Sequence, residues 1–149
     1  LWYSISSAHI LYEILRLHYD GCNSICGLPD FSSKIYTINI QNKDYYLVIT
    51  NTIFSNRDAR QSVIAFVINN NKLTQAPIFK TKTKLLSRID VDFDFFSVVD
   101  RPERPLELIT FNSKQDTLFI PVVDKDGKVT KRNILYVFNG TVLEFRGIK

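Results

Sequence analysis

The stretch "VIAFVINNNKL", residues 63–73, predicts a strand and the turn that ends it. Residues 63–68 are all apolar, and a strand without a polar position is typical of one that is covered on both faces. The asparagines that follow tolerate positive φ, which favours a tight hairpin turn over Asn69–Lys72. So short a loop makes neighbouring strands antiparallel. We therefore interpret residues 63–68 as a central strand of an antiparallel sheet.

Three more stretches are continuously apolar: "YYLVI" (45–49), "LFIPVV" (118–123) and "ILYVF" (134–138). Further hairpin turns are predicted at "DKDGK" (124–128) and at Asn139-Gly140, where both residues tolerate positive φ. We expect strands over residues 34–40, 44–53, 61–69, 72–80, 82–86, 88–98, 106–112, 117–123 and 130–146, the last being two strands joined at Asn139-Gly140.

One helix is predicted, over residues 7–20. Ile10, Ile14 and Leu17 are spaced so that they fall on one stripe of a helix. We expect this helix to pack on the sheets and to cover one of their outer faces. The other outer face has no evident cover within the chain, and an uncovered apolar face indicates a partner or a second copy.

These elements predict a mainly β fold of antiparallel meanders with one N-terminal helix. Two roughly four-stranded units, residues 34–80 and 106–149, share an order of strands and turns and are joined by residues 81–105. The shared order suggests an internal duplication, although any two runs of hairpins look alike at this level. Sandwich-like and barrel-like arrangements both fit the pattern. A chain of 149 residues is expected to form a single domain, residues 1–149.

The stretch "KTKTKLLSRIDVDFD", residues 80–94, alternates charged side chains with others. If its two halves pair antiparallel, the charges form a cross-strand ladder in which each pair stabilises the sheet by about a few tenths of a kcal/mol. A calcium site at the three aspartates is the weaker alternative, because alternate residues on a strand lie about 6.6 Å apart. The predicted structural pairs are Lys80–Asp94, Lys82–Asp92 and Lys84–Asp90.

Cys22 and Cys26 are the two cysteines of the chain, and they lie in "GCNSICG" just after the predicted helix. Their spacing is not the C-x-x-C of redox and zinc sites. They form a small disulfide in an oxidising compartment or act as buried hydrophobes in a reducing one, and we favour the disulfide. His9 and His18 fall on opposite sides of the helix, so they cannot share a metal. No metal or cofactor site is predicted.

Several classes of function have no support in the sequence. The chain has no nucleophile elbow and no glycine-rich phosphate loop, so we name no catalytic residue. It has no apolar run of the roughly 20 residues that a membrane-spanning helix needs. The net charge of +4 is spread along the chain, which disfavours nucleic-acid binding. The sequence contains no Met, and we expect that a segment before Leu1 carried a targeting signal.

The combined pattern favours a non-enzymatic binding domain of an extracytoplasmic bacterial protein, periplasmic or secreted. We expect a protein or peptide partner, bound through an edge strand or an uncovered sheet face, or self-association. A small-molecule hydrolase with acid–base residues on loops is the first alternative, and it requires a pocket with displaced pKa values. Nucleic-acid binding is the second, and it requires the following residues to share one face: Lys34, Lys43, Lys72, Lys131 and Arg132.

Overall fold

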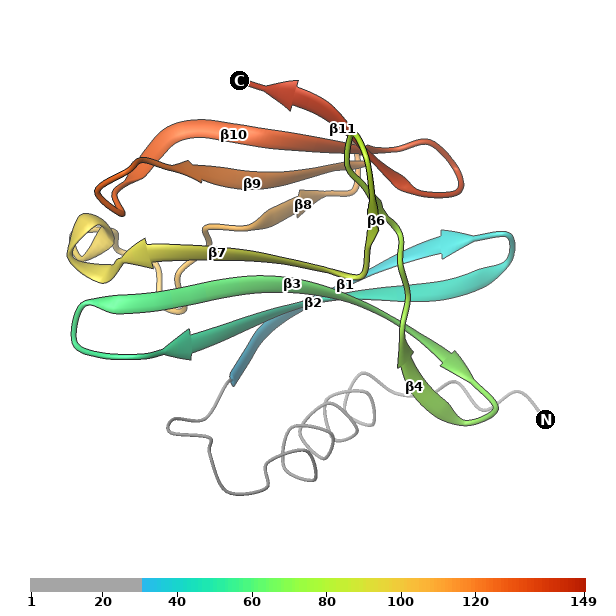
Figure 1. Cartoon of the computed structure of the whole chain (residues 1–149). Coiled ribbons are helices and arrows are strands. Elements are labelled where there is room, and N and C mark those ends of the chain that lie inside the picture. Colours follow the sequence, from blue (N-terminus) through green and yellow to red (C-terminus); the bar gives the residue numbers. More distant parts are fainter. Residues whose placement is uncertain (1–30) are drawn as a thin grey trace.

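The computed structural model describes residues 31–149, which form two β-sheets around a shared core (Figure 1). The predicted mainly β fold with antiparallel sheets is confirmed. The predicted helix over residues 7–20 lies outside the described residues. The first sheet contains β1 (Phe31–Ile40), β2 (Lys43–Ile53), β3 (Asp58–Asn69), β4 (Lys72–Gln75) and β7 (Arg88–Asp94). The second contains β5 (Phe79–Lys80), β6 (Leu85–Leu86), β8 (Thr110–Asn112), β9 (Thr117–Val123), β10 (Val129–Phe138) and β11 (Leu143–Ile148).

The order of the first sheet is β1-β2-β3-β4, and β3 carries two partners along one edge. β7 pairs with residues 58–64 of β3, and β4 pairs with residues 66–69. The order of the second sheet is β6-β5-β11-β10-β9-β8, in which only the short β5–β11 pair is parallel among the described strands. Each predicted four-stranded unit thus falls mainly within one sheet. Their internal duplication stays a prediction.

Residues 95–109 cross from the first sheet to the second. The segment leaves β7, forms the 3₁₀ helix η1 (Phe95–Val98) and reaches β8. It contains a cis peptide bond between Arg104 and Pro105. In the described part of the chain, no helix is long and apolar enough to cross a membrane.

The hairpin turns follow the residues that accept positive φ. Asn70 and Asn71 have φ angles of 51° and 62° between β3 and β4, as the asparagine run predicts. The turn at Asn139-Gly140 is wider than that dipeptide. Asn139 donates its backbone N–H to the carbonyl of Val142, and the loop closes between Phe138 and Leu143.

The structure corrects the cross-strand ladder predicted within residues 80–94. β5 and β6 pair with each other, because Thr81 Oγ1 accepts the backbone N–H of Lys84 and closes a turn inside the lysine run. β7 pairs instead with β3, which places Asp92 opposite Arg60. As predicted, Val91 and Phe93 of β7 are buried and Asp90 and Asp92 are exposed, but Asp94 is buried as well. The predicted lysine–aspartate pairs are therefore not formed between β5, β6 and β7. The residues of that predicted ladder were Lys80, Lys82, Lys84, Asp90, Asp92 and Asp94.

β2 and β3 are buried on both faces, as their unbroken apolar sequences predict. Leu47 and Val63 point into the core between the sheets, where they join Leu118 of β9. Val48 and Ile64 form a second cluster with Phe66, and alternation along the strands puts this cluster on the opposite face. The outer face of the second sheet is less covered. On this outer face, the apolar side chains of Phe119, Leu135 and Val137 are half-buried.

Gln61 is a fully buried polar side chain that joins β3 to the crossing segment. Its Nε2 donates to Asn51 Oδ1 at 2.9 Å and to the backbone carbonyl of Leu106 at 2.8 Å. Its Oε1 accepts the backbone N–H of Ile109 at 2.7 Å. Because a buried peptide group without a partner is costly, this amide fixes residues 106–109 against the first sheet.

We predict that Gln61→Leu lowers the free energy of unfolding by about 3 kcal/mol, because it leaves the Leu106 carbonyl and the Ile109 N–H without a partner at about 1–3 kcal/mol each. Urea denaturation measures this loss. Gln115→Leu, at an exposed position, is the matched control and is expected to change stability by less than about 0.5 kcal/mol. Equal effects of the two variants would show that the Gln61 amide does not hold the segment.

Candidate functional site

Three connecting segments lie at the same end of the molecule. They are the β2–β3 turn, η1 with the crossing segment, and the β9–β10 turn, all on the left in Figure 1. The backbone links them directly: Phe95 donates its N–H to the carbonyl of Arg57, and Asp94 donates its N–H to the carbonyl of Gly127. Both sheets therefore contribute to this end.

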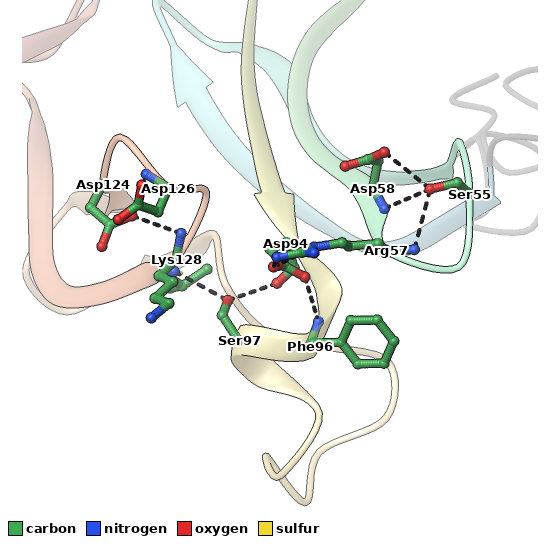
Figure 2. Close-up of polar contacts among 10 residues, drawn as sticks. Ser55, Arg57, Asp58, Asp94, Phe96, Ser97, Asp124, Asp126 and Lys128 are labelled. Carbon is green, nitrogen blue, oxygen red and sulfur yellow. Dashed lines mark hydrogen bonds and ion pairs between the residues drawn. The ribbon is translucent and has the colours of Figure 1, made fainter.

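The β2–β3 turn is ordered by its own side chains. Ser55 Oγ accepts the backbone N–H groups of Arg57 and Asp58, and it donates to the Asp58 carboxylate. The backbone of Phe54 also bonds to the Asp58 carbonyl at 2.9 Å. The side-chain contacts among Ser55, Arg57 and Asp58 are drawn in Figure 2, and they hold the short loop "SNRD" (55–58) in one shape.

Asp94 is the central contact between the three segments (Figure 2). Its carboxylate caps η1 by accepting the N–H of Phe96 at 3.0 Å, and it pairs with Arg57 at 2.8 Å. Its backbone carbonyl accepts the hydroxyl of Ser97, and that hydroxyl accepts the N–H of Val129. A single buried aspartate thus anchors η1, the β2–β3 turn and the start of β10.

A cavity of about 340 Å³ opens at this end, and we call it the end cavity. It lies between the end of β2, the start of β3, the end of β7 and the crossing segment. Among the described residues, arginine is the only type of ionisable side chain in the lining. The described lining consists of Asn51, Thr52, Ile53, Ser55, Asn56, Ala59, Arg60, Phe93, Phe95, Arg104, Pro105 and Leu106.

Large apolar side chains are exposed around the same end. Of the six described large hydrophobic side chains that are exposed, four lie at the end of β2, on the β2–β3 turn, on η1 or directly after it. The ring of Phe96 is 59% exposed and points away from the polar cluster around Asp94 (Figure 2). We call these four side chains the end surface; they are Ile53, Phe54, Phe96 and Val99.

The aspartates of β7 have arginine partners in place of the predicted lysines. Asp92 accepts two hydrogen bonds from Arg60, whose guanidinium also lies 5.2 Å from the centre of the Phe54 ring. Asp90 accepts a hydrogen bond from Arg88 at 2.6 Å. Within residues 31–149, the structure brings together no group of three or more metal-ligating side chains. Cys22 and Cys26 lie outside the described residues, so their disulfide stays a prediction.

A second cavity, of about 420 Å³, lies on the outer face of the second sheet. The half-buried side chains of Phe119, Leu135 and Val137 line it together with polar groups, including Arg146 and Lys149. The sequence predicted one uncovered outer face without indicating which sheet it belongs to. It lacks the exposed large side chains found at the end surface.

The end cavity was not predictable from the sequence. Two signals were present: "FDFFSVV" (93–99) interrupts the strand alternation, and "DRPERP" (100–105) places arginines on a segment that two prolines stiffen. Neither signal reveals that both segments meet the β2–β3 turn. Comparisons with protein-family models, with curated proteins and with solved structures each find no match to this chain.

We predict that Asp94→Ala lowers the free energy of unfolding by about 1–2 kcal/mol, because η1 loses its cap. The exposed pairing with Arg57 adds little to this loss. Denaturation in urea gives the value. Asp126→Ala is the matched control, since this exposed aspartate of the β9–β10 turn bonds through its backbone N–H. A loss no larger than that of the control contradicts the anchoring role.

The lowered pKa of Asp90 makes the stability of the fold depend on pH. Partial burial raises this pKa, but the Ser62 hydroxyl and the guanidinium groups of Arg88 and Arg60 together lower it below the ordinary 3.8. A carboxylate with a lowered folded-state pKa stabilises the fold above its unfolded-state value, and this contribution is lost as the pH falls through the folded-state value.

We therefore predict that Asp90→Asn is less stable than the original chain at pH 7 and that the difference shrinks between about pH 4 and pH 2. Urea denaturation at a series of pH values and constant ionic strength measures it. A difference that stays constant or widens toward pH 2 contradicts the interpretation.

Proposed function

We propose that this protein is a non-enzymatic binding domain that recognises a protein or peptide partner through the end surface and the end cavity. One observation carries the proposal: exposed Phe54 and Phe96 directly follow Ile53 and Phe95, which line an apolar cavity of about 340 Å³. Exposed apolar side chains that gather in one place indicate an interaction site. Aromatic anchors beside a pocket are also the usual centre of binding energy in an interface.

The end cavity favours binding over catalysis. Its described ionisable side chains are Arg60 and Arg104, and arginine stays protonated at ordinary pH. Such side chains hold anions but are poorly suited to proton transfer. The carboxylate of Asp90, whose pKa is lowered, is not part of the described lining. A hydrolase therefore has less support here than a binding domain.

Nucleic-acid binding has less support for a different reason. The basic residues named for it are divided between the sheets: Lys34, Lys43 and Lys72 belong to the first, and Lys131 and Arg132 to the second. Lys34 also lies 3.9 Å from the Glu107 carboxylate. We also propose an extracytoplasmic, bacterial setting, and its support is the pair of cysteines, Cys22 and Cys26, in the sequence.

The proposal places the contact at the end of the molecule. The sequence favoured an edge strand or an uncovered sheet face for this role. The half-buried stripe of Phe119, Leu135 and Val137 on the second sheet is the alternative surface, and a second copy of the chain is its simplest occupant. Any binding test must therefore distinguish the two surfaces.

We predict that selection of a random dodecapeptide library displayed on phage against the immobilised full chain enriches a family of related peptides. Binding of a synthetic peptide of that family, measured by calorimetry, is expected to weaken at least about 10-fold in Phe96→Ser and in Phe54→Ser, because each change removes an aromatic contact. Leu85→Ser is the matched control. Leu85 is 49% exposed but belongs to the β5–β6 hairpin, so its variant should bind like the original chain.

Equal binding by the original chain and both phenylalanine variants contradicts the proposed surface. A loss confined to Leu135→Ser, on the outer face of the second sheet, would move the site to that face. Failure to enrich any peptide family contradicts peptide recognition itself. Far-ultraviolet circular dichroism and urea denaturation of each variant exclude loss of the fold as the cause of weaker binding.

A further inference from the structure

Arg104 differs from the other arginines of this end in what surrounds its charge. Arg57 pairs with Asp94, and Arg60 pairs with Asp92. The guanidinium of Arg104 instead donates to backbone carbonyls, those of Val99, Arg101 and Glu103. No ion pair joins it to a carboxylate of a described residue. Carbonyl groups orient the guanidinium but carry no full negative charge to neutralise it.

The position of Arg104 is fixed before any ligand binds. Its carbonyl partners lie at 2.7–3.1 Å, and its guanidinium stands 5.9 Å from the centre of the Phe95 ring. These hydrogen bonds use only some of the N–H donors of the guanidinium, so others remain for a ligand. A guanidinium held in this way loses little conformational freedom when it binds a carboxylate, and its planar fork matches two carboxylate oxygens.

The rest of the end cavity suits an apolar group. Arg104 lines the cavity together with Ile53, Phe93 and Leu106, and a volume of about 340 Å³ falls within the range of ligand pockets. Apolar surface that enters such a cavity contributes about 25 cal/mol per Å² removed from water. The cavity therefore combines an apolar interior with one oriented, uncompensated positive charge.

From this combination we infer that the end cavity binds a large apolar side chain of a partner peptide together with the carboxylate of an Asp or Glu close to it in sequence. The inference rests on the proposed function and specifies its ligand. Phe54 and Phe96 are exposed and directly follow the lining residues Ile53 and Phe95. A peptide that also contacts these rings continues beyond the cavity, so we assign the carboxylate to an internal acidic residue and not to a chain terminus.

The test uses the full chain and a peptide enriched from the dodecapeptide library, synthesised with an acetylated N-terminus and an amidated C-terminus. A second peptide carries Gln in place of the acidic residue nearest the apolar anchor, or Asn where that residue is Asp. We expect the amide form to bind the original chain at least about 10-fold more weakly, because a charge-assisted hydrogen bond is lost. Arg104→Gln should bind both peptides equally and as weakly as the original chain binds the amide form.

Two further variants separate charge from geometry. Arg104→Lys keeps the charge without the fork, so its preference for the acidic peptide should lie between those of the original chain and Arg104→Gln. Arg101→Gln is the matched control, since Arg101 belongs to the same segment, pairs with Glu103 and is absent from the described lining. It should retain the full preference.

Each result decides between distinct conclusions. If the original chain binds the acidic and amide peptides equally, or if Arg104→Gln retains the preference, the inferred ligand is wrong while the proposed peptide recognition stands. A third form of the peptide has a free C-terminal carboxylate, and if only this form binds, the assignment to an internal acidic residue is wrong. If no peptide family is enriched at all, the proposed function fails and the inference fails with it.

Discussion

The side-chain amide of Gln61 is the interaction on which the binding end depends. β3 holds this residue in the middle of the first sheet, where water does not reach it. The amide has to find polar partners inside the protein, and it finds them in Asn51 and in the backbone at Leu106 and Ile109. Leu106 lies in the wall of the end cavity, and Arg104 precedes it by two residues. A core hydrogen-bond network thereby positions a surface segment that has no regular secondary structure of its own.

The strands and most turns were predictable because they depend on local patterns. The unbroken apolar stretches at 45–49 and 63–68 are central strands buried on both faces, as expected. The asparagines at 70 and 71 adopt positive φ where the sequence placed a turn. The ladder in residues 80–94 failed because two pairings satisfy the same alternation. Thr81 closes a turn within the lysine run, and β7 then pairs with β3, whose Arg60 forms an ion pair with Asp92.

The candidate site was not predictable in the same way, because its residues come from segments that are distant in sequence. Ile53, Phe93 and Arg104 meet only after both sheets have formed and the crossing segment has been anchored. A sequence pattern reports what lies three or four residues away, whereas the cavity is made by contacts such as that between Gln61 and Ile109. The exposed Phe96 was visible in "FDFFSVV" but looked like part of a strand, and the cap formed by Asp94 ends the strand before it.

The most direct measurement of the central claim is a crystal structure of the full chain with an enriched peptide bound. We expect an apolar side chain of the peptide to lie between Ile53, Phe93 and Leu106, and a carboxylate of the same peptide to contact the Arg104 guanidinium. A peptide found instead on the outer face of the second sheet, over Phe119 and Leu135, with the end cavity unchanged, would contradict it.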